Sequence, residues 1–224
     1  MSPLDEYYEL RRSASRWSKD LFERYAEEVQ CRRGCFFCCE DISVLPIEYE
    51  ALRRALEEGG YPRPEQLGGP PQDEGHTPEE RAARGSRDRT PYGTTANPYQ
   101  QERRRRCAFL GREGECTVYA ARPVICRTHG LPLAYRLYEY DETGAQVPGN
   151  SHIDAWCDLN FAHLSREHAG AYFDYHGRID MAEVNDELDR LNRRFISSPD
   201  GEPYRRYRRG DRGEWIRLSE LMRG

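Results

Sequence analysis

The chain has 224 residues, of which 37% are hydrophobic and 33% are charged, and its net charge is −5. This length suits a single domain, and the acidic balance argues against indiscriminate binding to nucleic acid. No apolar run approaches the length of a membrane span, so we expect no membrane partner. The acidic N-terminus lacks a signal-peptide stretch, which predicts a cytoplasmic location.

Residues 2–29 have the pattern of one amphipathic helix. Ser2 is the expected N-cap, and Pro3 suits the first turn. Six side chains are expected on one buried stripe: Leu10, Ala14, Trp17, Leu21, Tyr25 and Val29. This helix would lead the chain directly to Cys31.

The stretch CRRGCFFCC at 31–39 places four thiols, those of Cys31, Cys35, Cys38 and Cys39, within nine residues. Thiolate is the ligand that proteins use for zinc and for iron-sulfur clusters, and such tight spacing in an intracellular chain indicates metal binding. The alternative is that the cysteines are small buried side chains without chemistry. Metal binding explains the spacing better, because packing alone does not require cysteine four times at this range.

Pro46 and Glu48 are expected to open a second helix, which ends at Gly59-Gly60. From about 59 to 100, Gly, Pro and charged residues dominate and apolar periodicity disappears. We interpret this region as a surface insertion in which only residues 77–80 suggest a short capped helix. A disordered linker between two domains is the alternative.

Residues 107–119 alternate around Gly111 and Gly114, which predicts a tight hairpin that brings Cys107 close to Cys116. Residues 131–141 alternate like a strand, and Asp141 to Gly144 has the composition of a turn.

Asp180 with Glu183 forms a capping box that predicts a helix as far as Phe195. A basic C-terminal tail is expected at about 193–224. Within it, residues 215–221 are expected to dock on the core as a short helix or strand.

These elements predict a mainly α chain with a small β-hairpin and an irregular cysteine-rich metal core, which is an α+β fold. Neither an internal repeat nor a βαβ rhythm is present. We expect a single domain over residues 1–224, because cysteines on both sides of the insertion share one task.

All eight cysteines of the chain are candidate metal ligands: Cys31, Cys35, Cys38, Cys39, Cys107, Cys116, Cys126 and Cys157. Disulfides are rare in a reducing compartment, and the adjacent Cys38 and Cys39 could not easily pair with each other.

Three pieces of the sequence carry a family resemblance: CRRGCFFCC at 31–39, CAFLGREGECTVYAARPVICRTHGLPL at 107–133 and CDLNF at 157–161. In their order and flanking residues they resemble the YkgJ-type cysteine-cluster family, also described as the zinc- or iron-chelating CxxCxxCC domain. The resemblance implies a metal-chelating domain with cysteine ligands. One departure is that three residues, not two, separate Cys31 from Cys35, which puts the role of Cys31 in doubt.

The cofactor is expected to be an iron-sulfur cluster or zinc. Eight thiolates suit two four-cysteine zinc sites or one to two clusters, and the triplet followed by a vicinal cysteine favours iron-sulfur. The pattern Cys31-x3-Cys35-x-Phe37-Cys38 also fits radical S-adenosylmethionine enzymes, but the repeated β/α scaffold of that class is not predicted here.

Four polar residues flank the expected ligands in sequence: His129, His152, Asp154 and Asp158. The histidines could bind metal or move protons, and the carboxylates could orient a ligand. Surface histidines and solvated loop carboxylates are the alternatives.

Arg122 and Arg127 bracket Cys126 and could donate hydrogen bonds to thiolates or lower their pKa. An ion pair with Asp or Glu is the alternative. Arg103–Arg106 and the run Tyr204–Arg209 present arginine, interleaved with tyrosine in the second run, which suits contact with phosphates and bases. However, Lys19 is the only lysine of the chain, so arginine is abundant everywhere and a solvated face is favoured.

The leading hypothesis is a metal-binding protein with a structural or redox role. One alternative is a metal-dependent enzyme that modifies a protein or peptide partner, and whether the chain is an enzyme stays open. Another alternative is a nucleic-acid-associated metal-binding module, although nucleic acid is a disfavoured partner.

Overall fold

The computed structural model of the chain describes residues 1–32, 35–36, 38–39, 41–62, 106–157, 159–208 and 215–222. Its α-helices are α1 (Pro3–Arg24), α2 (Pro46–Glu58), α4 (Val124–Thr128), α5 (Arg166–His176) and α6 (Met181–Ser197). Its strands are β1 (Ser43–Val44), β2 (Leu133–Tyr140), β3 (Gln146–Ala155), β4 (Ile179–Asp180) and β5 (Ile216–Arg217). Short 3₁₀ helices are η3 (Tyr119–Ala121), η4 (Glu202–Arg208) and η5 (Leu218–Met222). The expected α+β class is confirmed.

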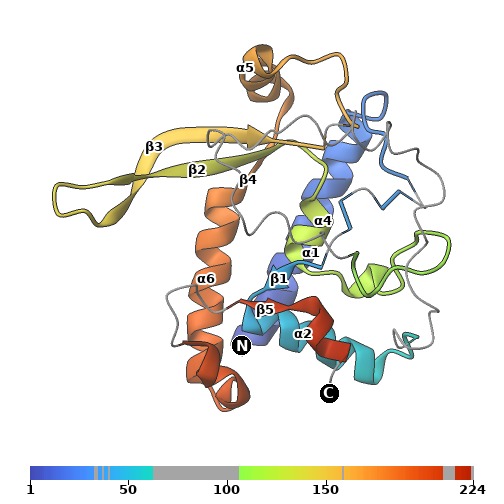
Figure 1. Cartoon of the computed structure of the whole chain (residues 1–224), viewed down its shortest axis with the longest axis vertical. Coiled ribbons are helices and arrows are strands. Elements are labelled where there is room, and N and C mark those ends of the chain that lie inside the picture. Colours follow the sequence, from blue (N-terminus) through green and yellow to red (C-terminus); the bar gives the residue numbers. More distant parts are fainter. Residues whose placement is uncertain are drawn as a thin grey trace.

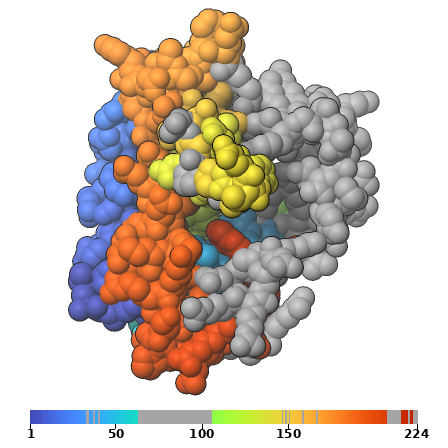
Figure 2. Space-filling model, turned by 90° about the vertical axis from the view of Figure 1, so that its left-hand side faces the viewer, coloured from blue at the N-terminus to red at the C-terminus, as the bar shows by residue number. Residues whose placement is uncertain are grey.

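The strands form two small sheets. In the larger one, β2 lies between β3, which is antiparallel to it, and β4, which is parallel to it. The β2–β3 hairpin extends well beyond the helices, and seen from the side its tip stands between α5 and α6 (Figures 1 and 2). In the smaller sheet, β1 pairs with β5 and joins the C-terminal segment to the start of α2.

Helix α1 begins as its sequence predicts. The Ser2 hydroxyl accepts a hydrogen bond from the Asp5 amide, and the Asp5 carboxylate accepts one from the Ser2 amide. The expected end of this helix at residue 29 is wrong, because the helix ends at Arg24 with Tyr25 as its C-cap. There the Tyr25 hydroxyl donates a 2.6 Å hydrogen bond to the Gly177 carbonyl, and its ring is buried. This anchor turns the chain toward the cysteine loop.

The expected buried stripe is confirmed at Ala14, Leu21 and Tyr25 but is wrong at Trp17. Trp17 is 41% exposed, whereas the neighbouring Ser18 is buried. The Ser18 hydroxyl donates a 2.9 Å hydrogen bond to the carbonyl of Arg127 in α4. A polar residue with an internal partner can therefore occupy a core position that hydrophobicity alone does not predict.

Helices α2 and α6 confirm their predicted starts. Pro46 stands in the first turn of α2, and Gly59 caps its end. Asp180 caps α6 by accepting hydrogen bonds from the amides of Ala182 and Glu183. Both helices pack with α1, because α1 contacts α2, α4 and α6. The rest of the expected insertion after residue 62, including the helix at 77–80, lies outside the described residues.

The interior has two hydrophobic clusters. The larger one is built around α1, α6 and β2 and includes Phe161 and Phe173. The smaller one contains Leu52, Phe109 and Leu218, and both Cys107 and Cys116 pack against it. The smaller cluster therefore supports one wall of the cysteine region.

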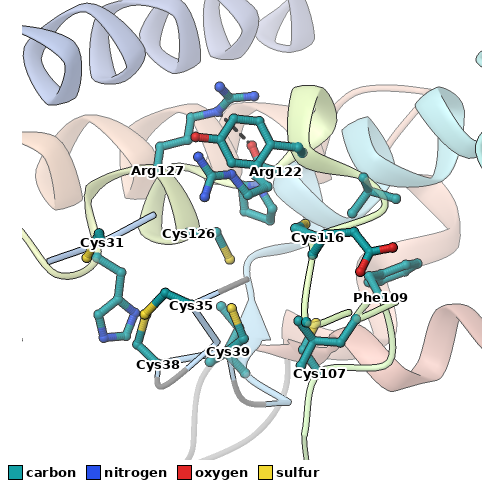
Figure 3. Close-up of a pocket in the computed structure, with 18 of the residues that line it drawn as sticks. Cys31, Cys35, Cys38, Cys39, Cys107, Phe109, Cys116, Arg122, Cys126 and Arg127 are labelled. Carbon is teal, nitrogen blue, oxygen red and sulfur yellow. Dashed lines mark hydrogen bonds between the residues drawn. The ribbon is translucent and has the colours of Figure 1, made fainter. Parts of the chain in front are cut away.

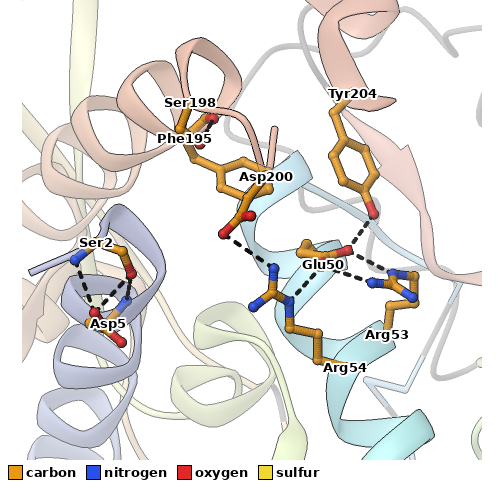
Figure 4. Close-up of polar contacts among 9 residues, drawn as sticks. All are labelled: Ser2, Asp5, Glu50, Arg53, Arg54, Phe195, Ser198, Asp200 and Tyr204. Carbon is orange, nitrogen blue, oxygen red and sulfur yellow. Dashed lines mark hydrogen bonds and ion pairs between the residues drawn. The ribbon is translucent and has the colours of Figure 1, made fainter. Parts of the chain in front are cut away.

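Glu50 of α2 ties η4 to the body of the protein (Figure 4). Its buried carboxylate accepts hydrogen bonds from Arg53 and Arg54 and a 2.7 Å bond from the Tyr204 hydroxyl. Burial raises the pKa of Glu50, but the hydrogen bonds from Arg53, Arg54 and Tyr204 together outweigh burial and lower it to about 2. The carboxylate is therefore ionised and compensated inside the fold.

The C-terminal region is more integrated than a basic tail. Arg193 and Arg194 belong to α6, where Arg194 forms an ion pair with Glu6 of α1. The predicted docking of residues 215–221 is confirmed, since Ile216 and Leu218 are buried. Residues 209–214 and 223–224 of the expected tail lie outside the described residues.

Strand β3 and the helices α4 and α5 are among the elements that have no counterpart in the predictions. In the part of the chain that the structure describes, no helix combines the length and apolar character that crossing a membrane requires.

Candidate metal centre

Hydrogen bonds to Asn160 hold the start of the cysteine loop in place. Asn160 is a fully buried residue that follows Cys157 by three positions. Its Oδ1 accepts a 2.8 Å hydrogen bond from the Gln30 amide, and its Nδ2 donates a 2.6 Å bond to the Gly130 carbonyl. The same Nδ2 group donates a 3.5 Å hydrogen bond to the Cys31 sulfur. Asn160 thus joins segments 129 residues apart and fixes the position of the Cys31 thiol.

Gly130 allows Cys31 and Cys157 to approach each other. It has a φ of +94°, and a Cβ atom at this position would lie 3.1 Å from the Cys31 sulfur and 3.7 Å from the Cys157 Cβ. The Cys157 amide donates a hydrogen bond to the Gly130 carbonyl at 3.4 Å. A larger side chain here would face both a strained backbone and a crowded thiol.

The rest of the loop turns twice and presents the vicinal pair. The Cys35 amide donates to the Arg32 carbonyl, and the Cys39 amide donates to the Phe36 carbonyl. A hydrogen bond with the Cys39 thiol raises the pKa of Cys38, and burial raises it further. The two vicinal thiols are therefore neighbours. Gly34 lies outside the described residues.

The segment that starts at Arg106 attaches directly to this loop. The Cys107 amide donates to the Cys39 carbonyl at 3.2 Å, and Arg106 donates to the Phe36 carbonyl at 3.3 Å. The Arg106 guanidinium also lies over the Phe36 ring, 4.8 Å from its centroid. These contacts place Cys107 beside Cys39.

The predicted hairpin between Cys107 and Cys116 is present only as a turn, which carries a single bridge, Leu110 with Cys116, and forms no extended strands. The Gly111 amide donates to the Glu115 carbonyl at 2.8 Å to close it. Burial, with a smaller contribution from the nearby Cys116 thiol, raises the pKa of Cys107 to about 11. The two thiols are therefore close, as the sequence predicts.

Cys126 is presented by the short helix α4. Glu48 fixes the start of this helix, because its buried carboxylate accepts hydrogen bonds from the Val124 amide at 3.1 Å and from the Leu45 amide at 3.3 Å. Burial raises the pKa of the Cys126 thiol, and Cys107 and Cys116 raise it further. Cys126 accordingly lies near the turn that carries those two thiols.

One cavity of about 640 Å³ collects these side chains. Seven of the eight cysteines line it: Cys31, Cys35, Cys38, Cys39, Cys107, Cys116 and Cys126. Figure 3 shows Cys31, Cys35 and Cys38 on one side and Cys107 and Cys116 on the other, with Cys39 and Cys126 between them. Cys157 is buried next to Cys31, behind this lining.

All eight thiols are free, and none takes part in a disulfide. Among the described residues, no three His, Cys, Asp or Glu side chains converge closely enough to surround a metal ion. Binding would therefore require the thiols to move closer together. The role of the eight cysteines as ligands stays a prediction.

The chemistry of the cavity nevertheless fits a thiolate-bound metal. Its donors are sulfur atoms, which zinc and iron-sulfur clusters accept. The cavity is also lined by Arg122, whose Nε is buried and has no hydrogen-bond partner among the described residues. Its guanidinium lies over the Tyr119 ring, 3.7 Å from the centroid. A cation in this position suits a centre in which several thiolates give a net negative charge.

Arg127 is held by hydrogen bonds to groups of the fold. It donates to the carbonyls of Arg122 and Ala120 and to the hydroxyl of Ser15. Neither a bond to thiolate nor an ion pair is among these three bonds. The other role considered from the sequence is present, because the charge of Arg127 lowers the pKa of Cys116 against the larger effect of burial.

The other polar residues that the sequence suggests for the site do not lie together in the structure. His129 is exposed and lines the cavity, whereas His152 is exposed on β3 opposite Arg136. Asp154 forms a 2.9 Å ion pair with Arg178. Asp158 lies outside the described residues.

The arginines considered for nucleic-acid contact are only partly described. Arg103–Arg105 and Arg209 lie outside the described residues. Arg205 donates to the Ile196 carbonyl at 3.4 Å and lies 3.9 Å from the Glu202 carboxylate. The nucleic-acid alternative stays a prediction.

Sequence reasoning missed Asn160 and Gly130. A glycine four residues after Cys126 is a weak signal for a close approach of backbone and ligand. Asn160 lies within the CDLNF piece that carries the family resemblance, but no local pattern distinguishes it from a solvated loop residue.

Comparison with known proteins gives one match. The family model CxxCxxCC, described as "Putative zinc- or iron-chelating domain", matches residues 30–146. The match spans more than half of the chain and includes the seven cysteines that line the cavity, whereas Cys157 lies beyond it. No curated protein and no solved structure matches the chain. The chain therefore belongs to the CxxCxxCC family of zinc- or iron-chelating domains.

Proposed function

We propose that this protein binds zinc or iron through the cysteine thiolates around the cavity and that the metal is a structural cross-link. The observation that carries the proposal is that one cavity gathers thiols from three separate segments: the loop after α1, the turn at 107–116, and α4. The finer assignment to YkgJ-type proteins belongs to this proposal and is supported by the three sequence pieces.

The composition favours a structural role. Only 37% of the residues are hydrophobic, and the loop that carries four cysteines contains no regular secondary structure in its described residues. A metal that joins such a loop to distant segments supplies stability that apolar burial does not. The eight free thiols also support a reducing compartment, in line with the expected cytoplasmic location.

The test is metal analysis of the full chain after aerobic and anaerobic purification, together with an absorption spectrum. We expect stoichiometric zinc in a colourless protein or iron in a brown one with charge-transfer bands. Zinc would exclude a redox role for the metal, and iron would make that role open to measurement. Absence of both metals, combined with rapid alkylation of all thiols in the native state, would refute the proposal.

A second candidate is a metal-dependent enzyme, because the cavity is as large as many small-molecule sites and is bordered by His129. An enzyme of this kind needs an open position on the metal. The cobalt-substituted protein would reveal it, since added imidazole or cyanide changes the visible spectrum of an open site. An unchanged spectrum at saturating ligand would exclude this candidate.

A further inference from the structure

The eight thiols are not evenly distributed around the cavity. One group gathers at Asn160 and Gly130, where the Cys31 sulfur and the Cys157 Cβ lie against the same glycine. Burial, with smaller contributions from the nearby thiols of Cys31, Cys38 and Cys35, raises the pKa of Cys157 to about 11. These four thiols are therefore neighbours, although Cys157 is far from the others in sequence.

A second group gathers at the turn. Leu110 pairs with Cys116 and donates its amide to the Cys107 carbonyl at 3.2 Å, so both cysteines border one short turn. Cys126 approaches them from α4, as the influence of both thiols on its pKa shows. The hydrogen bond from the Cys107 amide to the Cys39 carbonyl adds Cys39 to this side.

The vicinal pair stands at the boundary between the groups. In Figure 3, Cys38 lies on the side of Cys31 and Cys35, whereas Cys39 lies nearer Cys107. Each group thus has four thiols, the number that closes a structural zinc site or holds one iron-sulfur cluster.

We propose that the cysteines form two metal sites, one of Cys31, Cys35, Cys38 and Cys157 and one of Cys39, Cys107, Cys116 and Cys126. This inference rests on the proposed function and goes further by assigning every thiol. It makes Cys157, which the family match does not include, a full ligand. It also gives the CC dipeptide a role as the link between two adjacent centres.

The division has a structural consequence. The first site joins the loop after α1 to the segment between β3 and α5, and the second joins that loop to the turn and to α4. Arg122 lines the cavity together with thiols of both groups, and its charge lowers the pKa of Cys38 and of Cys116 against the larger effects that raise them. Its positive charge is placed to offset the negative charge of both centres.

The experiment titrates the metal-free, reduced full chain with Zn²⁺ and follows it by native mass spectrometry and by mapping of alkylated cysteines. The wild-type chain should bind two ions. Cys157→Ser should retain one ion and protect Cys39, Cys107, Cys116 and Cys126 from alkylation. Cys116→Ser should retain one ion and protect the other four. His152→Ala, on the exposed hairpin, is the control that should retain both.

Other outcomes overturn the division. If the wild-type chain binds a single ion, the two-site division is refuted without any variant. This outcome keeps the test valid if a cysteine variant fails to fold. The division is also refuted if a folded variant loses both ions. It is refuted as well if Cys157→Ser protects Cys31, Cys35, Cys38 and Cys39 together from alkylation. Metal binding with another grouping refutes only the division, whereas no binding by the wild-type chain refutes the proposed function as well.

Discussion

Asn160 has a denser set of polar contacts than a loop asparagine needs for its own solvation. Its buried carboxamide holds the Gln30 amide, the Gly130 carbonyl and the Cys31 sulfur at once. A side chain that donates to a thiolate and fixes its position commonly contributes to metal affinity. Asn160 is therefore a positioning residue for Cys31.

Replacing Asn160 by Leu should lower both stability and metal affinity. The Gln30 amide and the Gly130 carbonyl would lose their partners, at a cost of about 1–3 kcal/mol each. The apparent Zn²⁺ affinity should fall roughly 10- to 100-fold in competition with a chromophoric chelator. Asn192→Leu is the matched control, because Asn192 is also buried but accepts its hydrogen bond from Ile47, away from the cysteines. Equal chelator competition by both variants would show that Asn160 has no role beyond packing.

At the scale of elements, Glu48 links two helices through one buried carboxylate. It accepts from Leu45, which caps α2, and from Val124, which begins α4. Burial raises its pKa from the ordinary 4.5 to about 7, against the opposing effect of the two amides. The folded chain therefore holds this proton more tightly than the unfolded chain.

This shift predicts the direction of a pH effect. Because the folded pKa is raised, the stabilisation from protonated Glu48 is complete below pH 4.5 and is lost as the pH rises through about 7. Between about pH 5 and 7.5 the free energy of unfolding should fall by up to about 3 kcal/mol from this group. When urea unfolding is measured across this pH range, the free energy of unfolding should fall less steeply with pH for Glu48→Gln than for the wild type.

The ionisable groups near Glu48 do not produce the same dependence of stability on pH. The pKa of Glu50 is about 2, so this carboxylate is ionised throughout the window. Tyr7 of α1 and Cys126 of α4 lie near Glu48, and burial raises the pKa of each. Their ordinary pKa values already lie above the pH range in which Glu48 titrates. Identical slopes in the wild type and in Glu48→Gln would contradict the assignment.

The sequence predicts some elements well, for local reasons. Helices α2 and α6 have an N-terminal cap or proline and a regular apolar stripe, and both signals lie within a few residues. Strand β3 is hidden because Pro148, Gly149 and Asn150 interrupt its alternation. Helix α5 buries mainly Ala169 and Phe173, too few positions to give a clear period.

The candidate site also has one part that the sequence predicts and one part that it does not. The cysteines are recognisable from the sequence, because their spacing is a local pattern. Their grouping depends on contacts across the fold, such as Asn160 with Cys31 or Cys107 with Cys39, which no local pattern encodes. The burial of Ser18 and the exposure of Trp17 were missed for the same reason, since they depend on where α4 packs.

At the scale of the whole molecule, the metal should connect regions that the chain keeps far apart. Ligands that bind only the folded state stabilise it by about 4 kcal/mol when present at about 1,000 times their dissociation constant. For a chain of this size that corresponds to a shift in melting temperature of roughly 10 °C.

Removal of the metal by a strong chelator under reducing conditions should therefore lower the melting temperature by about this amount. Added Zn²⁺ or reconstituted iron should restore it, which controls for damage by the chelator. Calorimetry is the suitable measurement. An unchanged melting temperature after verified removal of the metal would contradict a structural role.

The central claim is that sulfur atoms of this chain hold the metal. X-ray absorption at the zinc or iron edge of the metal-loaded full chain measures the identity of the bound atoms directly. We predict a first shell made of sulfur alone, at about 2.3 Å. A shell that contains nitrogen or oxygen from the protein in place of the cysteine sulfurs would contradict the claim.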